Sequence, residues 1–210
     1  MLGADADGIV SIHLSSKLSG TYNSALQGAE TTSANCSVEV IDSAQGSMGL
    51  GLVVLKAAEA ANGGAGQDEV AALARDAAAR AQCFCLLETL EYLVKGGRIG
   101  RAQGLLGSVL GIKPMVILRD GTASPLGKAR TFSGALAKMK RTARDFAPVE
   151  SLAVMHSTTP ELAKEVADDL RDLLPEGEDP YVTRFGPLLG VYTGPGAIGI
   201  ALIQVKRKPL

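Results

Sequence analysis

Short apolar segments alternate along the chain with polar, glycine-containing segments, a pattern typical of α/β proteins. Ile9 to Leu14 and Val38 to Ile41 each have the composition of a buried strand. A polar turn and then a segment of helical composition follow each strand, and Tyr22 to Glu30 is the first of these helical segments. The repeated order of strand, loop and helix predicts a doubly wound, mostly parallel sheet in the first part of the chain.

The next stretch continues this order up to a glycine-rich junction. Gln67 to Gln82 carries apolar residues at helical spacing and predicts a helix that packs one face on the sheet. Cys83 to Leu87 predicts the following strand, and Glu88 to Lys95 predicts a short helix that ends at a pair of glycines. We place a domain boundary at this junction, so that residues 1–97 form an N-terminal α/β domain.

Residues 98–210 have a different pattern and predict a smaller α/β domain with antiparallel strands. Pro114 to Arg119 and a strand that ends near Arg130 flank the pair Asp120-Gly121, which is a hairpin signal. The remaining predicted elements are a helical run from Arg98 to about Leu110, helices at Phe132–Phe146 and Pro160–Leu174, and strands at Leu152–His156, Leu188–Tyr192 and Ile198–Val205.

Composition and charge exclude several classes of partner. The 210 residues are 46% hydrophobic and 20% charged, which is enough to build buried cores. The chain has 21 Lys and Arg against 22 Asp and Glu, so its formal net charge of -1 produces no overall field that attracts nucleic acid. Aromatic residues are only 4%, with no Trp, so a base-stacking platform is also missing. We therefore expect no nucleic acid partner.

The sequence predicts a cytoplasmic protein without a transmembrane segment. Its longest apolar stretches, Gly49 to Leu55 and Ala197 to Val205, are shorter than the ~20 residues that a membrane span requires. Asp5 and Asp7 stand where a secretory signal would carry basic residues.

The three cysteines are too few and too poorly spaced for a zinc site. Cys83 and Cys85 lie two residues apart on a predicted strand, so both thiols point to the same face. We expect them to be buried structural thiols.

Ser15, Ser16, Ser19 and Thr21 lie in a loop between the carboxyl end of a predicted strand and the start of a helix. Backbone N–H groups and the helix dipole favour an anion there, and ligands of α/β sheets bind at that end of the strands. The same hydroxyls also suit a purely structural role, because Ser and Thr cap helices and close turns. The loop is a candidate anion site with this alternative open.

The turn Gly190 to Gly196 is a second glycine-rich segment that can bring backbone close to a ligand, and it serves equally well as a tight structural turn. It matches neither a phosphate-binding P-loop nor a dinucleotide fingerprint. Arg98 and Arg130 are cations at element ends that we expect to point inward, although charges in such places are usually solvated. His13 and His156 form no catalytic triad with the available serines.

Several segments of the chain, taken in order and spacing, resemble the DegV family. The match runs over nearly the whole chain, and the ordered set is more specific than any one segment. The segments are Ser11 to Ala25 (SIHLSSKLSGTYNSA), Val40 to Ser43 (VIDS), Leu90 to Ile99 (LEYLVKGGRI), Ile112 to Pro114 (IKP) and Thr193 to Ala197 (TGPGA).

The resemblance implies a two-domain α/β protein that binds one long-chain fatty acid, such as palmitate, between its domains. Hydroxyls would hold the carboxylate, and the acyl tail would be buried. The resemblance also implies that the protein does no chemistry itself. It would act as an acyl carrier that presents the fatty acid to a fatty acid kinase, which makes acyl-phosphate for phospholipid synthesis. Apart from the bound fatty acid, we expect no cofactor and no metal.

Site residues carry over only where the segments match. Ser15 and Ser16, with Ser19, Gly20 and Thr21 beside them, correspond to the carboxylate loop. The other correspondences are Arg98 in the glycine-arginine turn, Arg130 in a Lys-x-Arg-Thr stretch, and Tyr192, Thr193 and Gly194 in the second turn.

Two features depart from the family pattern. Tyr192 stands where the family usually has His, and a phenol titrates near 10 rather than near 6.5, so Tyr192 does not supply the positive charge of an imidazolium. Family members also begin with a strand and a Thr-Ser-Gln-Pro-like loop that this sequence lacks, so we expect an N-terminal domain that is truncated relative to the family.

Two other function classes stay open. The chain suits a small-molecule enzyme, similar to a phosphotransferase, that uses the Ser/Thr loop as an anion cradle. A purely structural or regulatory interaction module would instead bind no lipid.

Overall fold

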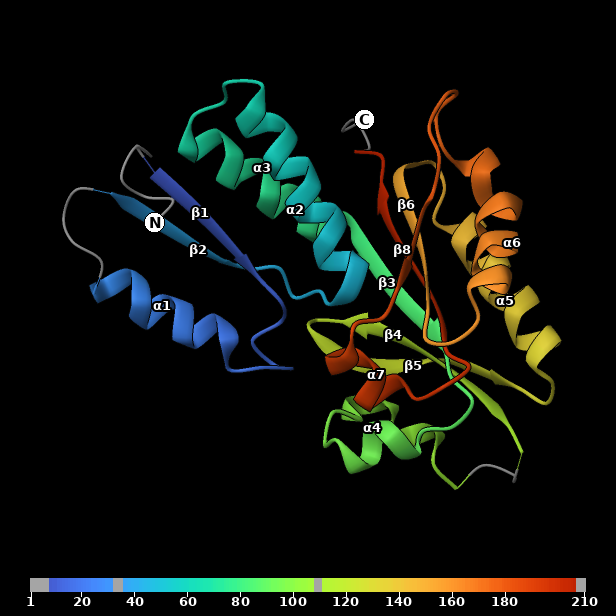
Figure 1. Ribbon diagram of the computed structural model, residues 1–210. Coiled ribbons are helices and arrows are strands. Elements are labelled where there is room, and N and C mark those ends of the chain that lie inside the picture. The colour runs from blue at the N-terminus through green and yellow to red at the C-terminus, as the bar shows by residue number, and fades with distance from the viewer. Residues whose placement is uncertain (1–7, 32–35, 108–110, 207–210) are drawn as a thin grey trace.

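The structure is a computed structural model that describes residues 8–31, 36–107 and 111–206. Its strands form two sheets, and helices cover both faces of the larger one (Figure 1). The strands are β1 (Gly8–His13), β2 (Ser37–Asp42), β3 (Ala81–Leu86), β4 (Lys113–Arg119), β5 (Thr122–Ala129), β6 (Val149–His156), β7 (Tyr181–Arg184) and β8 (Ile198–Gln204). The α-helices are α1 (Thr21–Thr31), α2 (Ser47–Asn62), α3 (Gln67–Arg80), α4 (Glu91–Lys95), α5 (Phe132–Asp145), α6 (Pro160–Leu170) and α7 (Pro187–Thr193), and the 3₁₀ helices are η1 (Gly100–Leu105) and η2 (Arg171–Leu173).

The smaller sheet is the parallel pair β1 and β2, with α1 packed beside it. The larger sheet has six strands in the order β5-β4-β3-β8-β6-β7. Within it only β6 and β7 are parallel, and the other neighbouring strands are antiparallel. The α/β class and the antiparallel strands predicted for the second part of the chain are therefore confirmed.

The predicted doubly wound, mostly parallel sheet is wrong for the larger sheet. The cause is the route of the chain after β3, which passes through α4 and η1 and then returns along β3 as β4. A connection that returns from the same end of a sheet makes its two strands antiparallel. The composition of the residues around β3 does not indicate whether the next strand runs parallel or antiparallel to it.

Strand β3 lies before residue 98, and its neighbours β4 and β8 lie after it. The larger sheet therefore contains strands from both sides of residue 98. The division of the chain into domains 1–97 and 98–210 stays a prediction.

The core is divided by the larger sheet into two apolar layers. On one face α2 and α3 pack against residues such as Ala201 and Ile203, and on the other α5 and α6 pack against Ile200 and Leu202. The central strand β8 alternates between these layers, so it is buried on both faces. A strand buried on both faces has a nearly continuous apolar sequence, which explains why its segment was predicted well.

Two local expectations fail near the C-terminus. Leu188 to Tyr192 was predicted as a strand and is part of helix α7, which begins at Pro187, a residue well suited to the first helical position. The short, exposed strand β7 was not predicted because its residues are mostly exposed and lack a run of buried positions.

The helical run predicted from Arg98 to about Leu110 is the 3₁₀ helix η1, and residues 108–110 lie outside the described residues.

Within the described residues, every helix is too short or too polar to cross a lipid bilayer.

We predict that Ile200→Ala lowers the free energy of unfolding by about 2–5 kcal/mol, because Ile200 is fully buried and its loss leaves a cavity. Val182→Ala is the matched control. Val182 lies on β7 and is 45% exposed, so this substitution should lower the free energy of unfolding by less than about 1 kcal/mol. Urea unfolding followed by circular dichroism measures both values. Equal losses for the two variants would contradict the placement of β8 at the centre.

Candidate ligand-binding pocket

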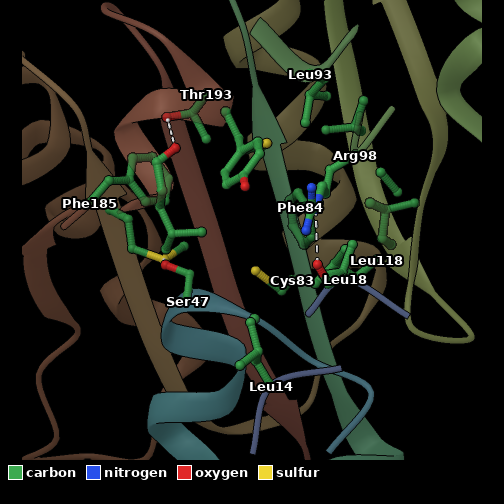
Figure 2. Close-up of a pocket in the computed structure, with 18 of the residues that line it drawn as sticks. Leu14, Leu18, Ser47, Cys83, Phe84, Leu93, Arg98, Leu118, Phe185 and Thr193 are labelled. Carbon is green, nitrogen blue, oxygen red and sulfur yellow. Dashed lines mark hydrogen bonds between the residues drawn. The ribbon is translucent and has the colours of Figure 1, made fainter. Parts of the chain in front are cut away.

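An apolar pocket lies between the loop after β1 and one face of the larger sheet (Figure 2). It measures ≈ 160 Å³, counted as space open to the centre of a water molecule. Since one water needs roughly 10–15 Å³ on this measure, the space suits a molecule rather than a single ion. The lining residues are Leu14, Leu18, Ser19, Gly46, Ser47, Cys83, Phe84, Cys85, Leu93, Arg98, Val116, Ile117, Leu118, Ala123, Met155, Phe185, Leu188, Leu189, Tyr192 and Thr193.

The walls of the apolar pocket come from elements far apart in the sequence. The β1–α1 loop supplies Leu14 and Leu18, strand β4 supplies Val116 and Leu118, and helix α7 supplies a further wall. In Figure 2, Arg98 and Leu18 lie on one side of the space, and Ser47 and Phe185 lie on the opposite side. The pocket therefore exists only when the small sheet and the large sheet are held together.

Arg98 is the only charged residue among those that line the apolar pocket. Its Nε donates to the carbonyl oxygen of Leu18 at 3.0 Å, and its Nη1 donates to that of Gly96 at 3.1 Å. The guanidinium carbon lies 5.5 Å from the centre of the Tyr192 ring, within range of a cation–π interaction. The structure describes no carboxylate in an ion pair with Arg98, and the residue is exposed, so its charge stands at the edge of an apolar space.

Four of the lining residues carry a hydroxyl group: Ser19, Ser47, Tyr192 and Thr193. Ser19 Oγ lies 2.7 Å from Thr21 Oγ1. Ser47 Oγ donates to the sulfur of Met155 at 3.1 Å, and Thr193 Oγ1 donates to the carbonyl oxygen of Leu189 at 3.1 Å. The residues that line the pocket include no carboxylate and no histidine, so none of these hydroxyls has a general base beside it there.

The thiols of Cys83 and Cys85 both line the apolar pocket, as their spacing on one strand predicts. Cys83 is buried, and Cys85 is partly buried. Burial raises the pKa of Cys83 to about 11, and burial also raises the pKa of Cys85, with a smaller contribution from the charge of Cys83. Both thiols are therefore protonated at neutral pH and act as uncharged parts of the wall.

The pocket brings together four of the residues predicted for the site: Ser19, Arg98, Tyr192 and Thr193. The others are outside its lining: Ser15, Ser16, Gly20, Thr21, Arg130 and Gly194. Binding roles for all of these residues stay predictions. The residues outside the lining have the following contacts.

Ser15 is fully buried, and its Oγ donates to the carbonyl oxygen of Gly121 at 2.7 Å. Ser16 donates its backbone N–H to Asp42 Oδ2 at 3.2 Å. Gly20 and Thr21 are exposed at the start of α1. The contacts of Ser15 and Ser16 therefore hold the loop to other parts of the fold.

Arg130 is exposed just after β5. Gly194 ends helix α7 at a positive φ of 71°, where a Cβ would stand 2.4 Å from the ring of Tyr92. A glycine at position 194 therefore fits both the backbone conformation and the close packing of the turn.

Sequence reasoning missed several lining residues, and Ser47 is the most informative. It follows β2 and opens α2, so the rule that ligands bind at the carboxyl ends of parallel strands applies to it as well as to the first loop. Gly46 and Met155 line the pocket without any local sequence signal, because only tertiary packing brings them there.

The arrangement suits an elongated apolar molecule with one anionic end. The walls exclude water from a tail, and Arg98 with nearby hydroxyls offers charge-assisted hydrogen bonds to an oxyanion at the edge.

Known proteins of one family match this chain over nearly its whole length. A family model described as "Uncharacterised protein, DegV family" matches residues 1–205. The DegV domain-containing protein SCO2569 of Streptomyces coelicolor is 42% identical over 200 residues, which cover 94% of this chain and 70% of the relative.

Solved structures show the same fold. The DegV family protein Cg2579 of Corynebacterium glutamicum matches with a TM-score of 0.85 and 30% identity, over 96% of this chain and 77% of its own. A DegV family protein of Thermus thermophilus, whose structure is described as fatty acid binding, matches with a TM-score of 0.81 and 30% identity, over 95% and 71%. The chain belongs to the DegV family.

Proposed function

We propose that this protein binds one long-chain fatty acid in the apolar pocket, with the carboxylate beside Arg98 and Ser19 and the acyl tail along the sheet. The observation that carries the proposal is the single cation at the edge of a pocket whose other walls are almost entirely apolar. A fatty acid has the matching distribution, one negative charge and a long hydrocarbon tail. Fatty acid binding by the Thermus thermophilus relative supports the same assignment.

The two ends of the ligand would contribute differently. Each buried methylene contributes about 0.8 kcal/mol, so the tail supplies most of the affinity. The carboxylate would fix orientation, because a guanidinium gives rigid, directed donors to it. Arg98 is itself positioned by the carbonyl oxygens of Leu18 and Gly96 and by the ring of Tyr192, so little reorganisation is needed on binding.

Ser19 is the hydroxyl of the first loop best placed for the carboxylate. It lines the pocket, whereas the Ser15 hydroxyl is committed to Gly121 and Ser16 is not a lining residue. Tyr192, which stands where the family usually has His, would hold Arg98 by its ring rather than carry charge.

A role as an acyl carrier for a fatty acid kinase is the further part of this proposal. It rests on the family resemblance and on the position of Arg98, which is exposed while also lining the pocket, so that a partner can reach a carboxylate held there. In this role the protein supplies binding and presentation, and the kinase supplies the chemistry. The phosphotransferase alternative has less support, because Ser15 already uses its hydroxyl within the fold and no base lines the pocket.

We predict that Arg98→Gln and Ser19→Ala each weaken palmitate binding, by roughly 1.5–3 kcal/mol for the charged group and about 1 kcal/mol for the hydroxyl. Ser16→Ala is the matched control and should leave the affinity unchanged, since Ser16 is not a lining residue. Isothermal titration of delipidated protein with palmitate measures all three. A loss of affinity in Ser16→Ala alone would contradict this position of the carboxylate and would indicate that it binds beside Ser16.

Gly46→Leu should reduce palmitate affinity at least tenfold by filling the space of the tail. A Cβ at position 46 would point toward Leu118 and Leu18, at 3.4 and 3.9 Å, and both of these leucines line the pocket. Gly46→Ala is the control, because a methyl group there makes ordinary van der Waals contacts. Thermal unfolding checks that both variants fold, and unchanged palmitate affinity in a folded Gly46→Leu would place the tail elsewhere.

Arg130→Ala is predicted to lower the rate of acyl-phosphate formation by a fatty acid kinase without changing palmitate affinity. Arg130 is exposed and outside the pocket, so its charge is available to a partner and not to the ligand. A kinase assay with equal concentrations of loaded protein measures the effect. Arg141→Ala, another exposed arginine, serves as the control, and equal rates for both variants and the parent would remove Arg130 from the docking surface.

A further inference from the structure

A second pocket, here called the polar pocket after the three polar side chains in its lining, uses residues of helix α7 that do not line the apolar pocket. It is lined by Ser157, Thr158, Arg184, Phe185, Gly186, Pro187, Gly190, Gly194 and Pro195. Its volume is ≈ 430 Å³ on the same measure as the apolar pocket, so it has room for a small molecule. Phe185 lines both pockets, but the polar pocket shares neither Arg98 nor any hydroxyl with the first.

The polar pocket lies at the carboxyl end of the only parallel pair in the larger sheet. Strand β6 leads through residues 157–159 into α6, and the chain returns as β7 parallel to β6. Ser157, Thr158 and Arg184 line the pocket where these two strands end. In a strand–helix–strand unit this edge is the usual place for a ligand.

The charge of the polar pocket is positive. Arg184 is exposed and, within the part of the chain that the structure describes, takes part in no ion pair. The lining contains no acidic residue, and Glu161 in the first turn of α6 is exposed and outside it. An unneutralised guanidinium at the edge of a cavity favours an anionic ligand.

Two hydroxyl groups of the lining have their protons available for such a ligand. Ser157 Oγ accepts a hydrogen bond from the backbone N–H of Ala197 at 2.9 Å, and Thr158 Oγ1 accepts one from Gly196 at 3.0 Å. Each hydroxyl thus accepts one hydrogen bond from the backbone, and among the described residues no acceptor is present for its O–H group. Together with Arg184 they form a set of donors, which matches an oxyanion with several acceptor oxygens.

Two side-chain atoms of the residues that flank this pair have no hydrogen-bond partner among the described residues, although His156 and Thr159 are not themselves lining residues of the polar pocket. His156 is 8% exposed, and its Nδ1 is buried without a hydrogen bond; Thr159 Oγ1 is buried without one as well. His156 lies opposite Arg184 in the register of β6 and β7. Buried polar atoms without partners are uncommon and often mark a site that a ligand or water completes.

We propose that the polar pocket is a site for a phosphate-type oxyanion, either free phosphate or the phosphate group of a monoester. Its donors would be the guanidinium of Arg184 and the hydroxyls of Ser157 and Thr158. The dipole of the eleven-residue helix α6 points its positive end toward the same edge and adds to the field. This proposal does not depend on fatty acid binding, because it uses none of the polar groups of the apolar pocket.

The experiment titrates the delipidated protein with inorganic phosphate and, separately, with methyl phosphate at constant ionic strength. Phosphorus NMR and the rise in Tm report binding. Arg184→Gln should weaken phosphate binding at least about tenfold, because a charge-assisted pair is lost. Arg141→Gln removes an exposed arginine that does not line the polar pocket and should leave phosphate binding unchanged.

A second variant keeps the test independent of Arg184. A Cβ at Gly190 would meet nothing within 4 Å, so Gly190→Glu should fold and place a carboxylate in the polar pocket, and Gly190→Ala is its control. Phosphate binding lost in Gly190→Glu and kept in Gly190→Ala supports the site.

Methyl phosphate binding at least as tightly as phosphate identifies a monoester site, and binding of phosphate alone identifies free phosphate. Absence of phosphate binding to the parent protein, or equal weakening by Arg184→Gln and Arg141→Gln, would overturn the proposal.

Discussion

The hydrogen bond from the buried Ser15 hydroxyl to the carbonyl oxygen of Gly121 fixes the loop after β1 against the turn between β4 and β5. Lys17 strengthens the same junction, because its Nζ donates to the carbonyl oxygen of Asp120 at 2.8 Å. Gly121 has a positive φ of 76°, and a Cβ there would stand 2.4 Å from Ser15 Oγ, so the contact needs a glycine. Because Leu14, Leu18 and Ser19 surround this junction, it sets one wall of the apolar pocket.

Much of the secondary structure follows from local sequence, and the Asp120-Gly121 hairpin is an example. Two residues with positive φ suit the turn, so the signal is complete within a few positions. The direction of β3 was not predictable in this way, because it depends on where the chain returns after η1. The helical state of Leu188 to Tyr192 was likewise hidden by the surrounding glycines.

The candidate site shows the same limit at the level of single hydroxyls. The sequence places Ser15, Ser16 and Ser19 in one loop, and the family resemblance put Ser16 and Ser15 ahead of Ser19. A carbonyl group 106 residues away takes the Ser15 hydroxyl into the fold, whereas Ser19 lines the apolar pocket. Such long-range partners are invisible to a pattern of a few residues. The shared face of Cys83 and Cys85, in contrast, needed only the alternation of a strand.

Protonated thiols along the apolar pocket have a consequence for the chemical durability of the protein. Oxidants attack the thiolate far more readily than the thiol, and burial holds the pKa of Cys83 at about 11. A sulfenic acid at this wall would place a polar group against a hydrocarbon tail. The burial that shapes the wall therefore also preserves its apolar character under oxidising conditions.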